Sequence, residues 1–209
     1  MKEIWDWADK SYIDEDIIPR QSKELIELKN LELKHNKKIT RIPKSIGNLK
    51  NLEEFLLVGT NVKKIPSSIS SLSNLKSLDI LQNTKIIDLP ESIGDLINLQ
   101  SFRIGHCNIG ELPNSMCYLP KLKKLFIGGN QNLKNFPEDI EKLSELEELD
   151  LGGNNNVVKL PDGIGNLSKL KELSIHGRSL SSLPDSIGKL KNLEVFTIHS
   201  DRPNSIRVL

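Results

Sequence analysis

Two histidines near the C-terminal end of the chain have the spacing that most suggests a chemical role. His176 and His199 are 23 residues apart, and Asp150 and Ser174 precede His176 by 26 and 2 residues. Two imidazoles and a carboxylate held together can bind a transition metal. A serine, a histidine and an aspartate can form a nucleophilic triad. Both hypotheses require an element that gathers these residues on one surface and shields them from water.

The remaining reactive side chains form no catalytic motif. Cys107 and Cys117 are the only cysteines, which gives no disulfide framework and fits a reducing compartment. The chain has no Cys-x-x-Cys pair, no His-Glu-x-x-His motif and no glycine-rich loop ending in Gly-Lys-Ser/Thr. We therefore expect no cofactor, no metal site and no enzymatic activity.

The charge balance narrows the class of partner. The 29 basic and 28 acidic residues give a formal net charge of +1, whereas nucleic-acid or anionic-membrane binding calls for a basic excess. No run approaches the ~20 apolar residues of a membrane span, and the polar N-terminus is no signal peptide. The expectation is a cytoplasmic protein that neither binds nucleic acid nor inserts into a membrane.

One apolar pattern, Leu-x-x-Leu-x-Leu-x-x-Asn, recurs along most of the chain. Residues 146–154 carry it in full, and the copies are 23 or 24 residues apart. The eight copies begin at Leu28, Leu52, Leu75, Leu99, Leu122, Leu146, Leu170 and Leu193. A fixed period of this length indicates a solenoid, in which stacked units share the core that one unit cannot form alone.

Each unit predicts its own local structure. The alternation in Leu-x-Leu predicts a short strand with one buried face. The spacing of three in Pro43-x-x-Ile46-x-x-Leu49 predicts a 3₁₀ or single helical turn, with proline at its first position. The asparagine position should satisfy backbone groups of its own turn and of the neighbouring one. Thr60 and Cys107 replace it as small donors; Arg178 and Asp201 fit poorly and predict looser turns in the last two repeats.

An apolar residue followed by proline, as in Leu89-Pro90, accompanies most copies and usually leads into Ser-Ile-Gly-x-Leu. On these residues the chain, from about residue 25 to 206, resembles the leucine-rich-repeat proteins. It is most similar to the 23-residue type found in many bacterial proteins and in eukaryotic Ras-pathway scaffolds. The richness of the chain in Lys, Asn and Ile suggests a bacterial source. The resemblance implies an α/β fold: a curved right-handed solenoid of about eight repeats, with a parallel β-sheet on the concave face and short 3₁₀ turns on the convex face.

The two ends of the stack require caps. Residues 1–24 contain Trp5, Trp7, Ile13 and Ile18 and predict a helical N-terminal cap, with the repeats over 25–200. Residues 201–209 are the only ones left beyond the repeats. Either this tail closes the last repeat or another subunit buries that end. We favour the tail, and with it a monomer over a dimer.

If the strands form as predicted, the variable positions between the leucines face a partner. Leu56, Val58, Leu81 and Phe126 stand out as apolar side chains on that face, and such clusters usually mark contact sites; the alternative is that a loop or the curvature of the chain covers them. The candidate contact residues are Leu56, Val58, Asp79, Leu81, Arg103, His106, Phe126, Asp150, His176 and His199.

Two further regularities accompany this face. Glycines occur at Gly105, Gly128-Gly129 and Gly152-Gly153. They either allow a partner backbone to approach closely or serve the turn at the strand exit. The second position of the repeat alternates in charge, as Lys29, Glu53, Lys76, Gln100, Lys123, Glu147, Lys171 and Glu194, which predicts ion pairs between neighbouring strands that help fix the register.

These features predict a protein–protein interaction module that binds a protein partner on its concave face. An open sheet offers neither a water-excluding pocket nor oxyanion donors, so the histidine and serine positions are interpreted as contact residues. Two alternatives stay open. One is a secreted bacterial effector that acts on a host protein after delivery by a specialised secretion system. The other is a self-associating structural protein whose C-terminal edge pairs with its own copy.

Overall fold

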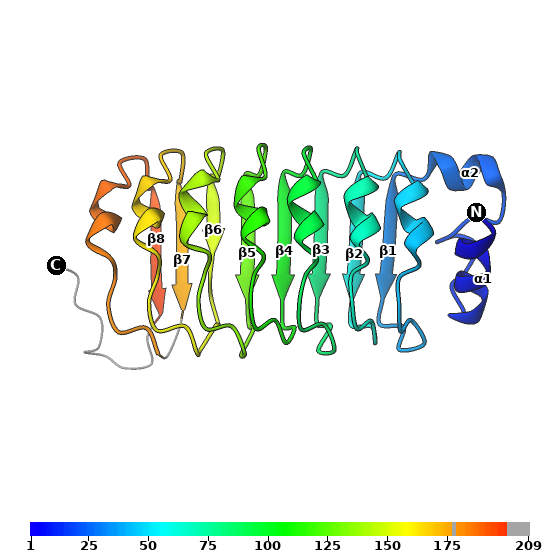
Figure 1. The fold of residues 1–209 in the computed structure, drawn as a ribbon, viewed down its shortest axis with the longest axis horizontal. Helices are drawn as coiled ribbons and strands as arrows, with labels where there is room; N and C mark the ends of the chain where they lie inside the picture. Colours follow the sequence, from blue (N-terminus) through cyan, green and yellow to red (C-terminus); the bar gives the residue numbers. More distant parts are fainter. Residues whose placement is uncertain (177–178, 200–209) are drawn as a thin grey trace.

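The structure is a computed structural model that describes residues 1–176 and 179–199. Eight parallel strands form one sheet in sequence order, so the chain advances by one strand with each repeat (Figure 1). The strands are β1 (Asn30–Lys34), β2 (Glu54–Val58), β3 (Ser77–Leu81), β4 (Ser101–Gly105), β5 (Lys124–Gly128), β6 (Glu148–Asp150), β7 (Glu172–His176) and β8 (Val195–His199). The predicted solenoid of about eight repeats is confirmed.

A row of 3₁₀ helices forms the second layer. They are η1 (Lys44–Asn48), η2 (Ser67–Ser71), η3 (Glu91–Asp95), η4 (Asn114–Tyr118), η5 (Glu138–Lys142), η6 (Asp162–Asn166) and η7 (Asp185–Lys189). The prolines do not occupy the first helical position as predicted. Pro43, for example, lies one residue earlier with extended backbone (φ −70°, ψ 151°), and its carbonyl accepts the Ile46 N–H at 3.1 Å.

The core is one continuous column of aliphatic and phenylalanine side chains between the two layers. In the register, Leu31, Phe55, Leu78, Phe102 and Leu125 stack as successive partners, and each is at most 2% exposed. Because these residues alternate with outward-facing ones, a shift of one residue would expose the whole column. The buried column therefore fixes which side chains face outward.

A buried polar ladder runs beside the core, as predicted from the asparagine position. The Asn83 amide donates to the carbonyls of Leu57 (2.8 Å) and Leu81 (2.9 Å), and its oxygen accepts the Thr60 N–H at 2.9 Å and the Thr60 hydroxyl at 2.6 Å. In the Cys107 copy the thiol donates to the carbonyls of Ile80 and Gly105 over 3.7 and 3.5 Å. One side chain thus joins the turns of successive repeats.

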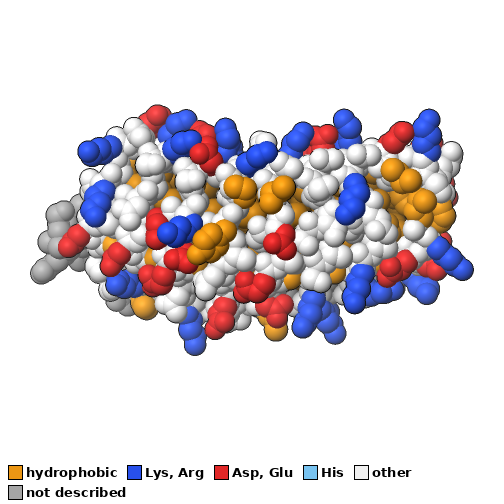
Figure 2. Space-filling view, turned by 45° about the horizontal axis from the view of Figure 1, so that its top comes forward, with side chains coloured by type: hydrophobic (Ala, Val, Ile, Leu, Met, Phe, Trp, Pro, Cys, Tyr) orange, Lys and Arg blue, Asp and Glu red, His pale blue; other side chains and the backbone are white. Residues whose placement is uncertain are grey.

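Alternating charges just before the strands pair between neighbouring repeats, as predicted, in two groups of three residues. Glu53 lies 3.5 Å from Lys29 and also pairs with Lys76, and Glu147 pairs with Lys123 (3.3 Å) and Lys171 (2.7 Å). These lysines lower the pKa of both glutamates. Basic and acidic side chains are interspersed over the face in Figure 2, in keeping with the net charge of +1.

The N-terminal segment lies against the first repeat. It contains α1 (Lys2–Lys10) and α2 (Ser22–Glu27), whose side chains Ile4, Trp7 and Leu25 are buried in the core. The Asn36 amide donates to the carbonyl of Ser11 at 2.8 Å, which ties this segment to the first turn. The predicted C-terminal closure by residues 201–209, and the looser turns at Arg178 and Asp201, lie outside the described residues.

Candidate functional site

The register places three rows of side chains on the outer face of the sheet. This is the face that points away from the core and the 3₁₀ helices, and it is the face that the sequence predicted to be concave. The middle row runs Glu32, Leu56, Asp79, Arg103, Phe126, Asp150, Ser174, Thr197 from β1 to β8. One flanking row begins Lys34, Val58, Leu81, Gly105, Gly128, and the other runs Asn30, Glu54, Ser77, Ser101, Lys124, Glu148, Glu172, Val195. The predicted contact residues whose side chains the structure describes on the strands thus share one face: Leu56, Val58, Asp79, Leu81, Arg103, Phe126 and Asp150.

Four of these side chains, Leu56, Val58, Leu81 and Phe126, form an apolar strip across β2 to β5. All four are half-buried. Val58 and Leu81 are direct register partners on neighbouring strands, whereas Phe126 is two strands beyond Leu81. What joins the two ends of the strip is the glycine between them on β4.

Gly105 and Gly128 make room for the ring of Phe126. A Cβ atom at Gly105 would lie 2.5 Å from Phe126 Cε1 and 3.3 Å from Leu81 Cδ2, and one at Gly128 would overlap the Phe126 ring. Both side chains thus reach toward the space left by the missing side chain at 105. Neither of the two sequence-based explanations anticipated this reason for the glycines.

The glycines one residue further along the chain are explained by the backbone conformation of the turn. This position follows directly after the row that contains Gly105 and Gly128. In all six repeats where it is described, the residue there has a positive φ: His35, Gly59, Gln82, His106, Gly129 and Gly153. Gly129 (φ 67°) and Gly153 (φ 75°) adopt this conformation without steric cost, which favours the turn explanation for them. His106 is exposed at the rim of the face, with its Nδ1 2.6 Å from where a Cβ at Gly129 would lie.

Asp79, Arg103 and Phe126 make a linked group at the centre of the face. Arg103 Nη1 lies 3.4 Å from Asp79 Oδ2, and the Arg103 guanidinium carbon lies 5.5 Å from the centroid of the Phe126 ring. Burial raises the pKa of Asp79, and the Arg103 charge opposes that rise. The guanidinium is therefore held between a carboxylate and an aromatic ring, both supplied by its own sheet.

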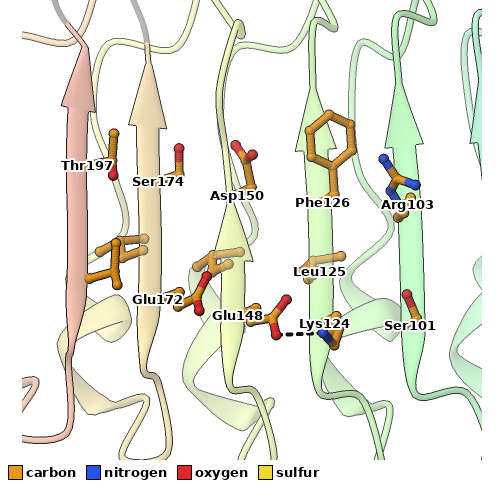
Figure 3. Close-up of a pocket in the computed structure, with 13 residues that line it drawn as sticks. Ser101, Arg103, Lys124, Leu125, Phe126, Glu148, Asp150, Glu172, Ser174 and Thr197 are labelled. Carbon is orange, nitrogen blue, oxygen red and sulfur yellow. Dashed lines mark hydrogen bonds and ion pairs between the residues drawn. The ribbon is translucent and has the colours of Figure 1, made fainter.

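A groove of about 420 Å³ opens beside this group, over β4 to β8. Figure 3 shows Arg103, Phe126, Asp150, Ser174 and Thr197 in one row across successive strands. A second row along the groove contains Ser101, Lys124, Glu148, Glu172 and Val195. This second row was missed among the candidate residues, although the same two-residue alternation that exposes Phe126 also exposes Lys124.

Charges in the second row interact directly. Lys124 Nζ lies 2.6 Å from Glu148 Oε1 (Figure 3). The hydrogen bond and charge of Glu148, followed by the charge of Glu172, raise the pKa of Lys124. The acidic side chains of the groove therefore favour the charged form of Lys124.

The hypotheses of metal binding and of a triad find no support in the described part of the molecule. His176 and His199 are register partners, but their side chains lie outside the described residues. Asp150 Oδ1 accepts the Gly152 N–H at 2.8 Å, so that carboxylate caps the end of its own strand. Among the side chains that the structure describes, which exclude those of His176 and His199, no group of three or more His, Cys, Asp and Glu could hold a metal ion.

Both cysteines belong to the core. Burial is the largest cause of the raised pKa of each thiol, to about 11 at Cys107 and about 12 at Cys117. Thiols with such pKa values are poor nucleophiles near neutrality. Neither cysteine is a candidate for catalysis.

No helix among the described residues has the length and apolar character needed to cross a bilayer.

Comparisons with known proteins identify the repeat. Residues 80–156 match the family model described as a leucine-rich repeat region, and no curated protein matches the sequence. The leucine-rich repeat domain of the type III effector XopL is similar, with 23% identity and a TM-score of 0.66. That alignment covers 94% of this chain and 81% of the effector domain.

Two further solved structures share the fold. Internalin C2 of Listeria monocytogenes is 27% identical with a TM-score of 0.66, and the alignment covers 84% of this chain and 72% of the internalin. The structure of a TLR13–ssRNA13 complex is 27% identical with a TM-score of 0.70, over 85% of this chain but only 27% of the other. The predicted class of fold is confirmed.

Proposed function

The chain is a leucine-rich-repeat protein, and from that premise we propose that it binds another protein on the outer face of its sheet. The apolar strip of Leu56, Val58, Leu81 and Phe126 is the proposed centre of the contact. Arg103, Asp79 and Asp150 frame the strip, and His106, His176 and His199 lie toward the strand ends. The proposal assigns no catalytic step to any of these residues.

The observation that carries this proposal is the arrangement around Gly105. Leu81 and Phe126 come from strands that are not neighbours, yet both reach the gap above that glycine. Half-buried apolar side chains joined into one strip are the usual core of a contact site, and an aromatic anchor with charged neighbours fits the composition of binding hot spots.

A protein fits this face better than a nucleic acid. Nucleic-acid binding needs several cations placed along the phosphate backbone. In the middle row, one arginine accompanies the carboxylates of Glu32, Asp79 and Asp150. The RNA in the TLR13 complex belongs to that protein, and it supplies no reason to place RNA here.

The test compares two double variants with the wild-type protein. Leu81→Asp with Phe126→Asp places two charges in the apolar strip. Ile87→Asp with Ile97→Asp places two charges at apolar residues that are 56% and 58% exposed and lie outside the strands. Each protein is used to capture partners from a lysate of the source organism and from a host-cell lysate, with circular dichroism and thermal melting as checks on folding.

The proposal expects a partner that the wild type and the Ile87/Ile97 variant retain and the Leu81/Phe126 variant loses at least tenfold, as for loss of a hot spot. Equal capture by all three folded proteins would contradict it. A partner found only in the host lysate would favour the effector alternative.

A second candidate, self-association, rests on one observation at β8. Val195 and Phe196 are 48% and 39% exposed, whereas Phe55 and Phe102 at the position equivalent to Phe196 are at most 2% exposed. Pairing of this edge with a second copy would cover Phe196. Solution mass decides between the two: a concentration-dependent dimer that disappears on deletion of residues 206–209 supports self-association, and a monomer supports the single-chain binding module.

A further inference from the structure

The groove beside Phe126 has the form of a slot for one long side chain. Phe126 forms one wall on β5, and Val195 lies at the opposite end on β8. Between them the middle row carries only the short side chains of Asp150, Ser174 and Thr197, as Figure 3 shows. A side chain inserted here would meet an aromatic surface first and polar groups beyond it.

The charges lining this slot do not cancel. Its three carboxylates are Glu148, Asp150 and Glu172, and its two cations are Arg103 and Lys124. Both cations already have partners, since Arg103 pairs with Asp79 at 3.4 Å and Lys124 with Glu148 at 2.6 Å. None of the ion pairs between described residues involves Asp150 or Glu172. The Glu172 carboxylate and the second oxygen of Asp150 thus remain for a ligand, while Asp150 Oδ1 accepts the Gly152 N–H at 2.8 Å.

The sheet itself contains an example of the required arrangement. On β3 to β5, the Arg103 guanidinium lies between the Asp79 carboxylate and the Phe126 ring. On the β6 side, Asp150 is the register partner of Phe126, so a carboxylate-bearing residue follows the aromatic residue in the same row. The β6 side lacks only the cation that Arg103 provides on the β4 side.

We propose that this groove receives an arginine side chain of the partner protein, with its aliphatic stem along Phe126 and its guanidinium at Asp150 and Glu172. Arginine fits better than lysine because a planar guanidinium can stack on an aromatic ring and bind two carboxylates through separate N–H groups. A phosphate-bearing ligand is disfavoured by the same carboxylates. This inference rests on the proposed protein-binding function and specifies what the partner presents.

The first experiment uses a small probe and needs no partner. Isotopically labelled protein is titrated with N-acetyl-arginine methylamide and, separately, with the citrulline analogue, which has nearly the same shape and no charge. The arginine compound should shift the amide resonances of Phe126, Asp150, Glu172 and Ser174 in a saturable manner, and the citrulline compound should not. Equal shifts by both compounds, or none by either, would overturn the proposal.

Variants of the carboxylates provide the matched control. Asp150→Asn with Glu172→Gln removes the two charges of the groove without changing side-chain size. Glu32→Gln with Glu54→Gln removes two charges from the same two rows at β1 and β2. We expect the first pair to weaken binding of the arginine compound about tenfold or more, as for loss of charge-assisted hydrogen bonds, and the second pair to leave it unchanged. Equal binding by both variant pairs would refute the assignment.

The captured partner then separates this inference from the function on which it rests. If Leu81→Asp with Phe126→Asp releases the partner while Asp150→Asn with Glu172→Gln retains it at full affinity, the binding face stands and the arginine slot is wrong. If both pairs release it and the Glu32/Glu54 pair does not, both proposals stand.

Discussion

Asn83→Ala should be among the most destabilising single substitutions available outside the apolar core. The side chain is fully buried and takes part in four hydrogen bonds, to Thr60 N, Thr60 Oγ1, the Leu57 carbonyl and the Leu81 carbonyl. Leu81 would keep a partner, because its carbonyl also accepts the Gly59 N–H at 2.9 Å. The Thr60 hydroxyl can rotate to a new acceptor. The Thr60 N–H loses its acceptor, and one lone pair of the Leu57 carbonyl loses its donor.

Each buried polar group left without a partner costs about 1–3 kcal/mol. Two such groups give an expected loss of about 2–6 kcal/mol in the free energy of unfolding, a large share of the ~5–15 kcal/mol typical of a folded domain. Urea denaturation measures this loss. Hydrogen exchange of the Thr60 amide locates it, since that amide should exchange much faster in the variant.

Asn108→Ala is the matched control. Asn108 is exposed and donates one hydrogen bond, to the Thr84 carbonyl at 2.8 Å, so water can replace it and its removal should cost about 0.5 kcal/mol or less. If the Asn83 and Asn108 variants lose equal stability, or if exchange of the Thr60 amide is unchanged, the ladder does not stabilise the repeats in the way argued.

Three further outcomes follow from the described contacts. Gly128→Ala should displace the Phe126 ring and cost about 1–3 kcal/mol in unfolding free energy; unchanged ring resonances and urea midpoint would contradict this. Glu147→Gln should flatten the acid side of the stability profile at low salt. The pKa of Glu147 is lowered in the folded state from its ordinary value of 4.5. Its contribution to stability is therefore complete above that value and is lost as pH falls through the folded pKa. If the melting temperatures of the variant and the wild type fall equally with pH below pH 5, this reasoning is wrong. Cys107 and Cys117, with pKa values of about 11 and about 12, should resist iodoacetamide at pH 8 until urea unfolds the chain, as read by mass spectrometry.

The architecture could be predicted from the sequence because each repeat carries the residue pattern of its own strand and turn. The leucine positions, the asparagine ladder and the charge alternation depend on neighbours one repeat away, and all are visible as a 23- or 24-residue period. The same period assigns Arg103, Phe126 and Asp150 to successive strands of one row. The register of the face was thus predictable, and the inward column enforces it.

The contacts within the face were not predictable in the same way. They depend on the direction that each side chain takes after it leaves the sheet. The ring of Phe126 leans over Gly105 and Gly128, and Arg103 turns toward both Asp79 and that ring. A periodic pattern records which face a residue occupies and nothing about its rotamer. The reason for the glycines therefore became apparent only with the packed side chains in place.

That packing also bears on how a partner would bind. Ordering a flexible side chain at an interface costs about 0.5–1.5 kcal/mol. Phe126 is already held, because two glycines admit its ring and Arg103 lies 5.5 Å from the ring centroid. Arg103 is in turn held by Asp79. The central anchor of the face is therefore positioned before any partner arrives. Substitutions that loosen it, such as Asp79→Asn, which removes the charge that pairs with Arg103, should therefore weaken binding.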